Sequence, residues 1–267
     1  MSQSLYMATA GSGEPVLLLH SGGMSSRQWR RLMDALAPSF RVLAPDFIGS
    51  GENPLWPDAE PFHFQKDVEA VERIIADLGG PVHLVGHSYG GFVGLTMARR
   101  NPAVIRSIAV YDPVAFGVLH DPEDAEALVD LRRTEAQRAW ADPAYGGGPE
   151  WMEAFFEFWN GPGTWESLPP DKQNAFLRVG KKVYGEVFTL LQDRTPRTGY
   201  SGVTAPALLL HGANSPLAAR RVVQYLGEAM PHATVRAVEG AGHMGPITHG
   251  GTVNDWVARH IQSAAQS

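Results

Sequence analysis

Short apolar runs alternate with longer amphipathic segments along most of this chain. The runs have the length of β-strands and are bounded by Gly and Pro; they cover residues 16–20, 42–45, 82–86, 105–111, 207–211 and 234–238. Other segments place apolar residues three and four positions apart, as helices with one buried face do; they are 29–36, 67–78, 217–229 and 253–263. This alternation predicts an α/β fold with a mostly parallel central sheet and helices on both faces.

The alternation stops between residues 114 and 200, where aromatic and acidic residues and Gly/Pro clusters replace the strand-like runs. We interpret 114–200 as an inserted helical cap (lid), which leaves 1–113 and 201–267 as the core. The cap is rich in aromatic residues, namely Trp140, Trp151, Phe155, Phe156, Phe158, Trp159, Trp165 and Phe176. We expect most of them to form a small core of the cap. Several, with Trp140 and Trp159 as our candidates, are expected to line an apolar substrate pocket against the sheet.

The third apolar run leads into residues 86–90 (Gly-His-Ser-Tyr-Gly) and then into a helix-compatible segment over residues 92–100. A Gly-x-Ser-x-Gly pattern between a strand and a helix is typical of a nucleophile elbow, which lifts a serine hydroxyl above the sheet. Gly86 and Gly90 have no Cβ, so the strand and the helix can approach closely. Ser88 is therefore the candidate nucleophile, although the pentapeptide alone also fits an ordinary turn.

A serine nucleophile needs a base, and the chain has ten histidines. His243 lies in the glycine-framed segment 240–244 after the last expected strand, at the sheet edge where Ser88 also emerges. We expect His87 to point away from Ser88, and His249 lacks the glycine frame. Histidines within or at the ends of strands should pack or form hydrogen bonds there; these are His20, His83 and His211. His243 is thus the expected base.

Attack of a serine on an acyl group puts negative charge on a carbonyl oxygen, which preorganised N–H groups must stabilise. The backbone amide of Tyr89, directly after Ser88, is one expected donor. The amide of Gly22 is the other, because this glycine lies just beyond the first apolar run. Gly23 and Met244, the neighbours of Gly22 and His243, are the expected substrate-binding residues of the core.

Together these motifs resemble the α/β-hydrolase fold superfamily over nearly the whole chain. The oxyanion segment of that family matches residues 20–22 (His-Ser-Gly), with Trp29 at the familiar downstream spacing. Its aspartate-containing turn matches residues 45–51, and the elbow and the Gly-x-Gly-His segment follow in the order of the family. The resemblance implies a serine hydrolase with an inserted cap, in which Asp46 braces loops and is not the catalytic acid.

The catalytic acid of this family is missing from its usual place. The resemblance puts it in a His-Gly-x-x-Asp segment after the penultimate strand, but residues 211–215 read His-Gly-Ala-Asn-Ser. Neither Ser215 nor Asn214 can supply the negative charge that orients a histidine. Some members of the family carry the acid after the strand that follows the elbow, where this chain has Asp112. We therefore expect Asp112 to be the acid, against a plain Asp-Pro turn or the more distant Asp193.

The composition of the chain restricts the classes of partner and cofactor that it can have. The chain has 267 residues, 44% hydrophobic content and a net charge of −6 without a basic run, which predicts a substantial core and a small-molecule substrate but no nucleic-acid partner. The absence of cysteine excludes disulfides, thiolate metal sites and a cysteine nucleophile. We expect no metal and no organic cofactor. Without a recognisable secretory signal or a run long enough for a membrane span, we expect a cytoplasmic protein with no membrane partner. The oligomeric state is not predicted.

The combined residues predict a serine hydrolase that cleaves a carboxylic ester or a related acyl bond of a small apolar substrate through an acyl-enzyme. Carbon–carbon bond hydrolases, lactonases, amidases and thioesterases share the same triad and stay open, as do lyases and cofactor-free perhydrolases. A low-turnover ligand-binding protein is a further alternative, because the usual acid position is vacant. Resembling dehalogenases and epoxide hydrolases use an aspartate at the elbow, and Ser88 argues against both.

Overall fold

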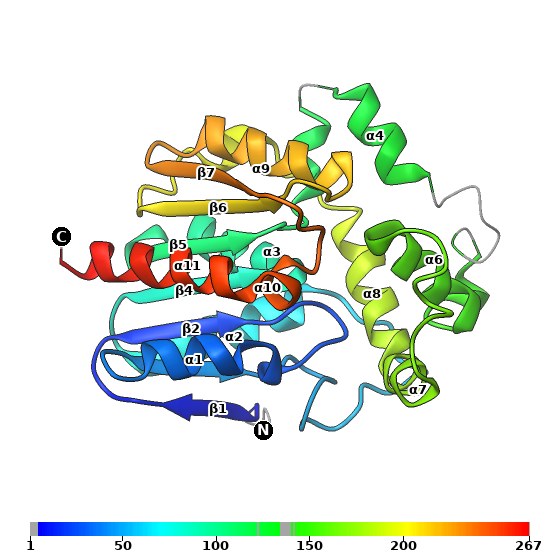
Figure 1. The fold of residues 1–267 in the computed structure, drawn as a ribbon, viewed down its shortest axis with the longest axis horizontal. Helices are drawn as coiled ribbons and strands as arrows, with labels where there is room; N and C mark the ends of the chain where they lie inside the picture. Colours follow the sequence, from blue (N-terminus) through cyan, green and yellow to red (C-terminus); the bar gives the residue numbers. More distant parts are fainter. Residues whose placement is uncertain (1–4, 122, 134–139, 141, 267) are drawn as a thin grey trace.

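Seven strands form one sheet in the computed structural model of this protein, which describes residues 5–121, 123–133, 140 and 142–266 (Figure 1). The strands are β1 (Met7–Ala10), β2 (Pro15–Leu19), β3 (Arg41–Pro45), β4 (Val82–His87), β5 (Ile105–Tyr111), β6 (Ala207–Gly212) and β7 (Ala233–Val238). Their order in space is β1-β3-β2-β4-β5-β6-β7, and all neighbours pair in parallel except β1 and β3. The predicted mostly parallel sheet is confirmed.

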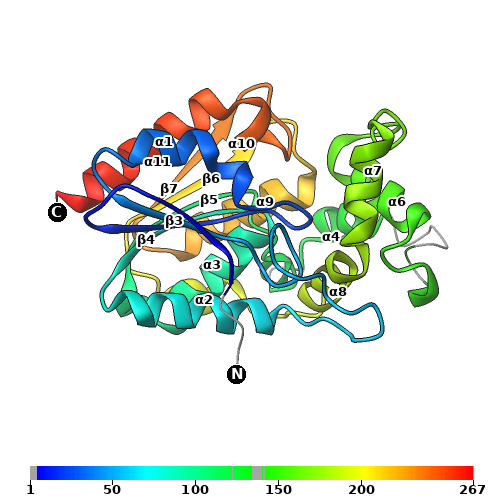
Figure 2. The same cartoon turned by 90° about the horizontal axis from the view of Figure 1, so that it is seen from below.

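Helices cover both faces of this sheet (Figure 2). One face carries α1 (Arg30–Leu36), α10 (Gly245–Thr248) and α11 (Gly250–Ala265), and the other carries α2 (Gln65–Leu78), α3 (Tyr89–Arg100) and α9 (Leu217–Ala229). Leu17 and Leu19 of β2 join the buried cluster under α2 and α3, whereas Val16 and Leu18 join the cluster under α1 and α11. Because both faces of a strand are buried, the strands appear in the sequence as continuous apolar runs.

The described residues form four further helices beyond the carboxyl ends of the parallel strands (Figures 1 and 2). They are α4 (Ala125–Arg132), α6 (Pro149–Asn160), α7 (Pro170–Arg178) and α8 (Gly180–Leu190). Short 3₁₀ helices occur at Ser26–Trp29, Pro102–Val104, Phe116–Leu119, Pro143–Tyr145 and Arg197–Tyr200. Within the described residues, no helix combines the length and the apolar character needed to cross a membrane.

No apolar run predicted β1, the antiparallel edge strand. It has only four residues, Met-Ala-Thr-Ala, and none of them is fully buried. A strand this short with small side chains carries too little hydrophobic signal to be distinguished from a loop. Its pairing with β3, from Met7 opposite Pro45 to Ala10 opposite Val42, extends the sheet on the side away from the elbow.

The junction between β4 and α3 is packed without space for side chains at two glycines. A Cβ on Gly86 would lie 2.6 Å from the carbonyl oxygen of Gly90. A Cβ on Gly90 would lie 2.5 Å from the carbonyl oxygen of His20 and closer still to that of Leu19. The start of α3 therefore lies directly against the backbone of β2 and β4, as the elbow motif predicts.

We predict that Gly90→Ala lowers the free energy of unfolding by about 3 kcal/mol or more, because its methyl group would collide with the backbone that follows β2. Gly94→Ala, one turn further along α3, is the matched control, since its Cβ would have Leu84 Cδ2 as its nearest neighbour, at 3.5 Å. It should change stability by no more than about 1 kcal/mol, because alanine favours a helix over glycine. Urea unfolding measures both variants, and equal values would contradict the close packing at Gly90.

Candidate active site

Ser88 sits on a strained turn between β4 and α3. Its φ of 53° and ψ of −117° lie outside the regions that L-residues ordinarily occupy. The turn is fixed by a hydrogen bond of 2.9 Å from the Ser88 amide to the carbonyl oxygen of Tyr111. Strain of this kind persists only where surrounding packing imposes it, and it concentrates at functional sites.

Ser88, His243 and Asp112 form one continuous chain of hydrogen bonds. Ser88 Oγ lies 3.0 Å from His243 Nε2, and His243 Nδ1 lies 3.1 Å from Asp112 Oδ2. The three side chains come from the elbow, from the loop after β7 and from the end of β5. The structure thus brings together the three residues that the sequence suggested as nucleophile, base and acid.

Asp112 is held in place by its own backbone and by Ser215. Its φ is 42°, another strained value for a residue other than glycine, and its amide donates to the carbonyl oxygen of Leu210 over 2.8 Å. The Ser215 hydroxyl donates to Asp112 Oδ2 over 2.6 Å. The residue at the usual acid position therefore contacts the carboxylate that reaches His243 from the neighbouring strand.

Burial governs the electrostatics of this pair. Desolvation raises the pKa of Asp112 to about 7, while the Ser215 hydrogen bond acts in the opposite direction. Desolvation lowers the pKa of His243 to about 3, so its Nε2 is free to accept a proton near neutral pH. A neutral imidazole between a hydroxyl and a carboxylate is the arrangement that general-base catalysis requires.

A second layer of side chains fixes the loop that carries His243. His87 Nε2 donates to the carbonyl oxygen of His243 over 2.8 Å, and His87 Nδ1 accepts from Gln28 Nε2 over 3.0 Å. The Tyr111 hydroxyl donates to the carbonyl oxygen of Gly242 over 2.7 Å. The elbow motif predicts that His87 points away from Ser88, but the sequence carries no local signal for this bracing, because the partner of His87 lies 156 residues away.

The backbone amides of Gly22 and Tyr89 are the two expected oxyanion donors. Neither makes a hydrogen bond to another described residue, and both residues line the same cavity as Ser88. Tyr89 is the first residue of α3, whose N-terminal amides carry partial positive charge. Such unpaired amides suit an oxygen that gains negative charge.

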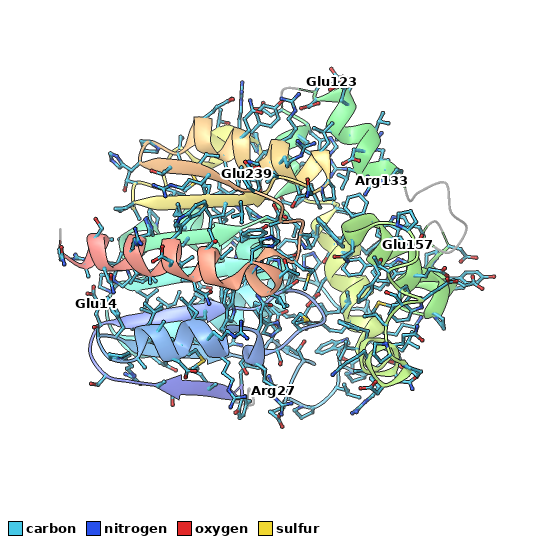
Figure 3. The ribbon with its side chains drawn as sticks, in the orientation of Figure 1. Glu14, Arg27, Glu123, Arg133, Glu157 and Glu239 are labelled. Atoms are coloured by element: carbon cyan, nitrogen blue, oxygen red, sulfur yellow. The ribbon has the colours of Figure 1, made fainter. Side chains whose placement is uncertain are left out.

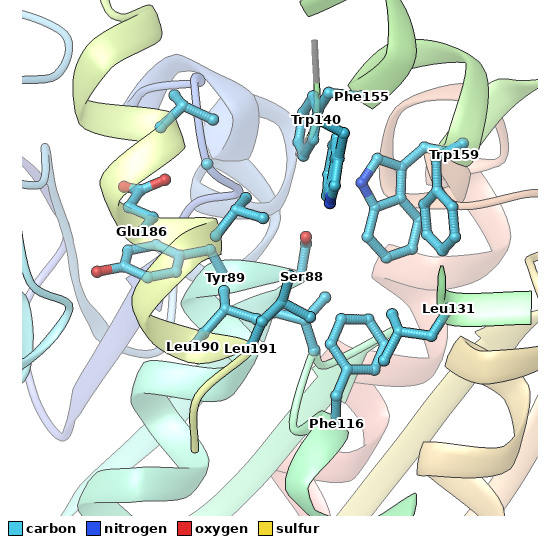
Figure 4. A pocket seen from close by; sticks show the side chains of 15 residues that line it. Ser88, Tyr89, Phe116, Leu131, Trp140, Phe155, Trp159, Glu186, Leu190 and Leu191 are labelled. Carbon is cyan, nitrogen blue, oxygen red and sulfur yellow. The ribbon is translucent and has the colours of Figure 1, made fainter. Parts of the chain in front are cut away.

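A largely apolar inner cavity of about 40 Å³ lies beside Ser88 (Figure 4). Its aromatic walls are Phe116, Trp140, Phe155, Phe158 and Trp159. Trp159 also stacks on His243, with ring centroids 3.6 Å apart and ring planes at 18°. This contact excludes water from one face of the imidazole.

The four expected substrate-binding residues lie in three different places. Trp140 and Trp159 line the inner cavity. Met244 lines a neighbouring outer groove, and Gly23 packs against Phe176 of α7. Other aromatic residues of the segment expected to form a cap pack together, because Trp151 and Trp165 belong to a separate buried cluster.

Three charged residues lie buried beside the inner cavity, whereas Arg27, Glu123 and Glu239, which Figure 3 labels, are exposed. They are Asp67 of α2 and Lys182 and Glu186 of α8, and each is at most 2% exposed. Lys182 Nζ lies 2.9 Å from Asp67 Oδ2 and also contacts Glu186 Oε1. Burial alone would lower the pKa of Lys182, but the two carboxylates raise it. Burial also raises the pKa of Glu186 to about 7.

The rival acids and bases have other partners. Asp46 accepts hydrogen bonds from the amides of Ser26 and Glu52, at 2.6 and 2.8 Å, and thus braces two loops. Asp193 accepts from the amide and hydroxyl of Thr195. Four histidines weighed against His243 contact neighbouring groups: His20 the carbonyl oxygen of Ser21, His83 the hydroxyl of Ser107, His211 the carbonyl oxygen of Gly212 and His249 the hydroxyl of Thr248. The described residues contain no group of three or more His, Asp or Glu side chains placed to hold a metal ion.

The fold and the elbow define an α/β-hydrolase, and residues 16–256 match the model of the Alpha/beta hydrolase family, to which the chain belongs. The chain is 26% identical over 249 residues to the (E)-2-((N-methylformamido)methylene)succinate hydrolase of Acinetobacter baylyi, covering 91% of this chain and 89% of that protein. It is 23% identical over 265 residues to the pimeloyl-(acyl-carrier protein) methyl ester esterase of Chromobacterium violaceum, covering 98% and 100%. A thermophilic esterase from Thermogutta terrifontis has the same fold, with a TM-score of 0.73, 21% identity and coverage of 97% and 93%.

We predict that the rate at which a serine-reactive fluorophosphonate labels Ser88 falls as the pH is lowered through about 7, where Asp112 gains a proton. Ser215→Ala removes a hydrogen bond that lowers the pKa of Asp112. That pKa should rise further, and the midpoint of the labelling profile should move to higher pH by about one unit. Ser50→Ala, which removes a buried hydroxyl with no partner among the described residues, is the control. A midpoint that moves equally in both variants would contradict the role given to Ser215.

Proposed function

We propose that this protein is a serine hydrolase that cleaves a carboxylic ester of a small, largely apolar acyl group. The observation that carries this function is the chain of hydrogen bonds from Ser88 Oγ through His243 to Asp112, at 3.0 and 3.1 Å. Hydrolases among the curated relatives, one of them a methyl ester esterase, support the same reaction class.

Acylation uses the free Nε2 of His243. Ser88 Oγ attacks the carbonyl carbon of the ester while its proton passes to Nε2, which creates a tetrahedral intermediate and an imidazolium. The amides of Gly22 and Tyr89 hold the oxyanion. When the intermediate collapses, the bond from carbon to the leaving oxygen breaks and Nε2 returns the proton to the departing alcohol.

Deacylation repeats these steps with water in place of the serine. His243 takes a proton from the water as its oxygen attacks the acyl-enzyme, and the same proton then goes to Ser88 Oγ as the acid departs. Asp112 keeps the Nδ1–H of His243 pointed at the carboxylate and stabilises the imidazolium. Its displaced position leaves this role unchanged, because it reaches His243 over 3.1 Å.

Residues 114–200 act in this function as a cap over the carboxyl end of the sheet. The aromatic walls contributed by α6, together with Leu190 of α8 and Leu191 directly after it, favour apolar acyl groups of limited size. The low-turnover alternative depended on a vacant acid position, and the contacts of Asp112 with Ser215 and His243 weigh against it. Lactones, thioesters and activated carbon–carbon bonds can use the same chemistry.

Ser88→Ala is expected to reduce kcat for p-nitrophenyl esters by about 10⁶ and to abolish fluorophosphonate labelling, because the attacking oxygen is removed. Hydrolysis at the wild-type rate in this variant would exclude the mechanism. Thermal unfolding of the same sample shows whether the variant is folded.

Asp112→Asn should reduce kcat by about 10⁴ while the protein stays folded, since an amide cannot stabilise the imidazolium. Asp193→Asn is the matched control, because it makes the same change at the alternative acid, and its kcat should stay within about twofold of the wild type. Normal turnover in Asp112→Asn, or a loss in Asp193→Asn instead, would move the acid away from Asp112.

A further inference from the structure

The buried cluster of Asp67, Lys182 and Glu186 has no part in the steps above, although it adjoins them. Tyr89, a proposed oxyanion donor through its amide, donates its hydroxyl to Asp67 Oδ2 over 2.8 Å. Lys182 Nζ lies between Asp67 and Glu186 and 5.1 Å from the centre of the Tyr89 ring. The cluster thus links α8 of the cap to α2 and α3 of the core directly behind the elbow.

The cluster contains one carboxylate more than its lysine can neutralise. Asp67 is paired with Lys182 and also accepts from the amide of Ile48 and the hydroxyl of Tyr89. An Asp67–Lys182 pair alone would therefore join the cap to the core. Glu186 adds a second buried negative group, which is costly unless a partner compensates it.

The two oxygens of Glu186 face different surroundings. Oε1 contacts Lys182, whereas Oε2 is the atom nearest to the Cβ position of Gly22. A Cβ on Gly22 would lie only 2.7 Å from Oε2, so this oxygen adjoins the proposed oxyanion hole. Glu186 lines the inner cavity with Ser88, and Figure 4 shows it on the opposite side of the Ser88 hydroxyl from Trp159.

The position of His243 indicates which part of a substrate would meet Glu186. His243 must give its proton to the leaving group, and it lines the outer groove together with Met24 and Met244. Neither His243 nor Met244 lines the inner cavity, whose lining includes Glu186 and Leu190 of α8 and Leu191 directly after it. The leaving group therefore belongs to the outer groove and the acyl group to the inner cavity.

We propose that Glu186 determines acyl specificity, because its Oε2 accepts a hydrogen bond from a hydroxyl or ammonium group near the carbonyl of the acyl part. A carboxylate beside the oxyanion hole would repel the negative charge of the intermediate. A hydrogen-bond donor on the substrate, placed between Glu186 Oε2 and the oxyanion, compensates that repulsion. The same donor offsets the energetic cost of burying Glu186. This role rests on the proposed function, since it assumes an acyl group bound to Ser88.

The test compares p-nitrophenyl esters that differ in one group on carbon 3 of the acyl chain: 3-hydroxybutyrate, 3-aminobutyrate and 3-methylbutyrate. A second series carries the same three groups on carbon 2. The measured quantity is kcat/KM for the hydroxyl or ammonium ester divided by that for its methyl isostere. In at least one series the wild-type ratio should be about tenfold or more, as expected for a hydrogen bond to a charged group.

Two variants separate the acceptor from its charge. Glu186→Met should bring both ratios close to one, because it removes the acceptor and keeps the length of the side chain. Glu186→Gln should retain most of the hydroxyl ratio through its amide oxygen but lose the ammonium ratio with the charge. Leu190→Met, which alters the same cavity wall one turn along α8, is the matched control and should affect all esters together.

A wild-type ratio near one in both series, or a ratio that persists in Glu186→Met, would show that Glu186 only joins the cap to the core. Failure of the proposed function has a different signature: no ester is hydrolysed and Ser88 is not labelled. In that case calorimetry measures the affinities of Ser88→Ala for methyl 3-hydroxybutyrate and methyl 3-methylbutyrate. The ratio of these affinities compares the hydroxyl group with the methyl group without turnover. Equal affinities, or a difference that Glu186→Met does not remove, would overturn the role of Glu186.

Discussion

The backbone of α3 begins in direct contact with the strands beneath it, because neither Gly86 nor Gly90 carries a Cβ. Ser88, at this close approach, has a strained φ of 53°. The first amides of α3, which carry partial positive charge, begin directly after Ser88. A hydrogen bond from His87 holds the loop of His243 against the elbow, so the positions of the candidate nucleophile and base depend on these two contacts.

The second requirement of the site is the exclusion of water. Trp159 covers the imidazole of His243, and Asp112 is fully buried. A buried carboxylate needs donors, which Ser215 and His243 supply. A carboxylate after β5 can lie close to the place of one after β6, because these strands are parallel neighbours. Tyr111 lies opposite Leu210, so the two strands end at the same edge of the sheet. Ser215, at the usual acid position of the family, makes a hydrogen bond to Asp112, the candidate acid.

Patterns that depend on near neighbours could be predicted from the sequence, and long-range contacts could not. The buried strands and the elbow of Ser88 are local signals, and His243 follows from its glycine frame. Asp112 emerged only by elimination, since the family resemblance showed the usual acid position to be vacant. The stacking of Trp159 on His243 joins segments from the cap and the core, and no periodicity encodes it. Lys182 and Glu186 have the i,i+4 spacing of an ordinary exposed ion pair.

Asp112 and Glu186 show how partners, rather than burial, determine what a carboxylate does. Burial raises the pKa of both to about 7. In Asp112, Oδ2 receives both the serine hydroxyl and the imidazole, so its charge acts on His243. In Glu186, Oε1 shares a lysine that Asp67 already neutralises, and Oε2 borders the inner cavity. The remaining walls are largely apolar, and Glu186 carries the one carboxyl group among the described residues that line the cavity.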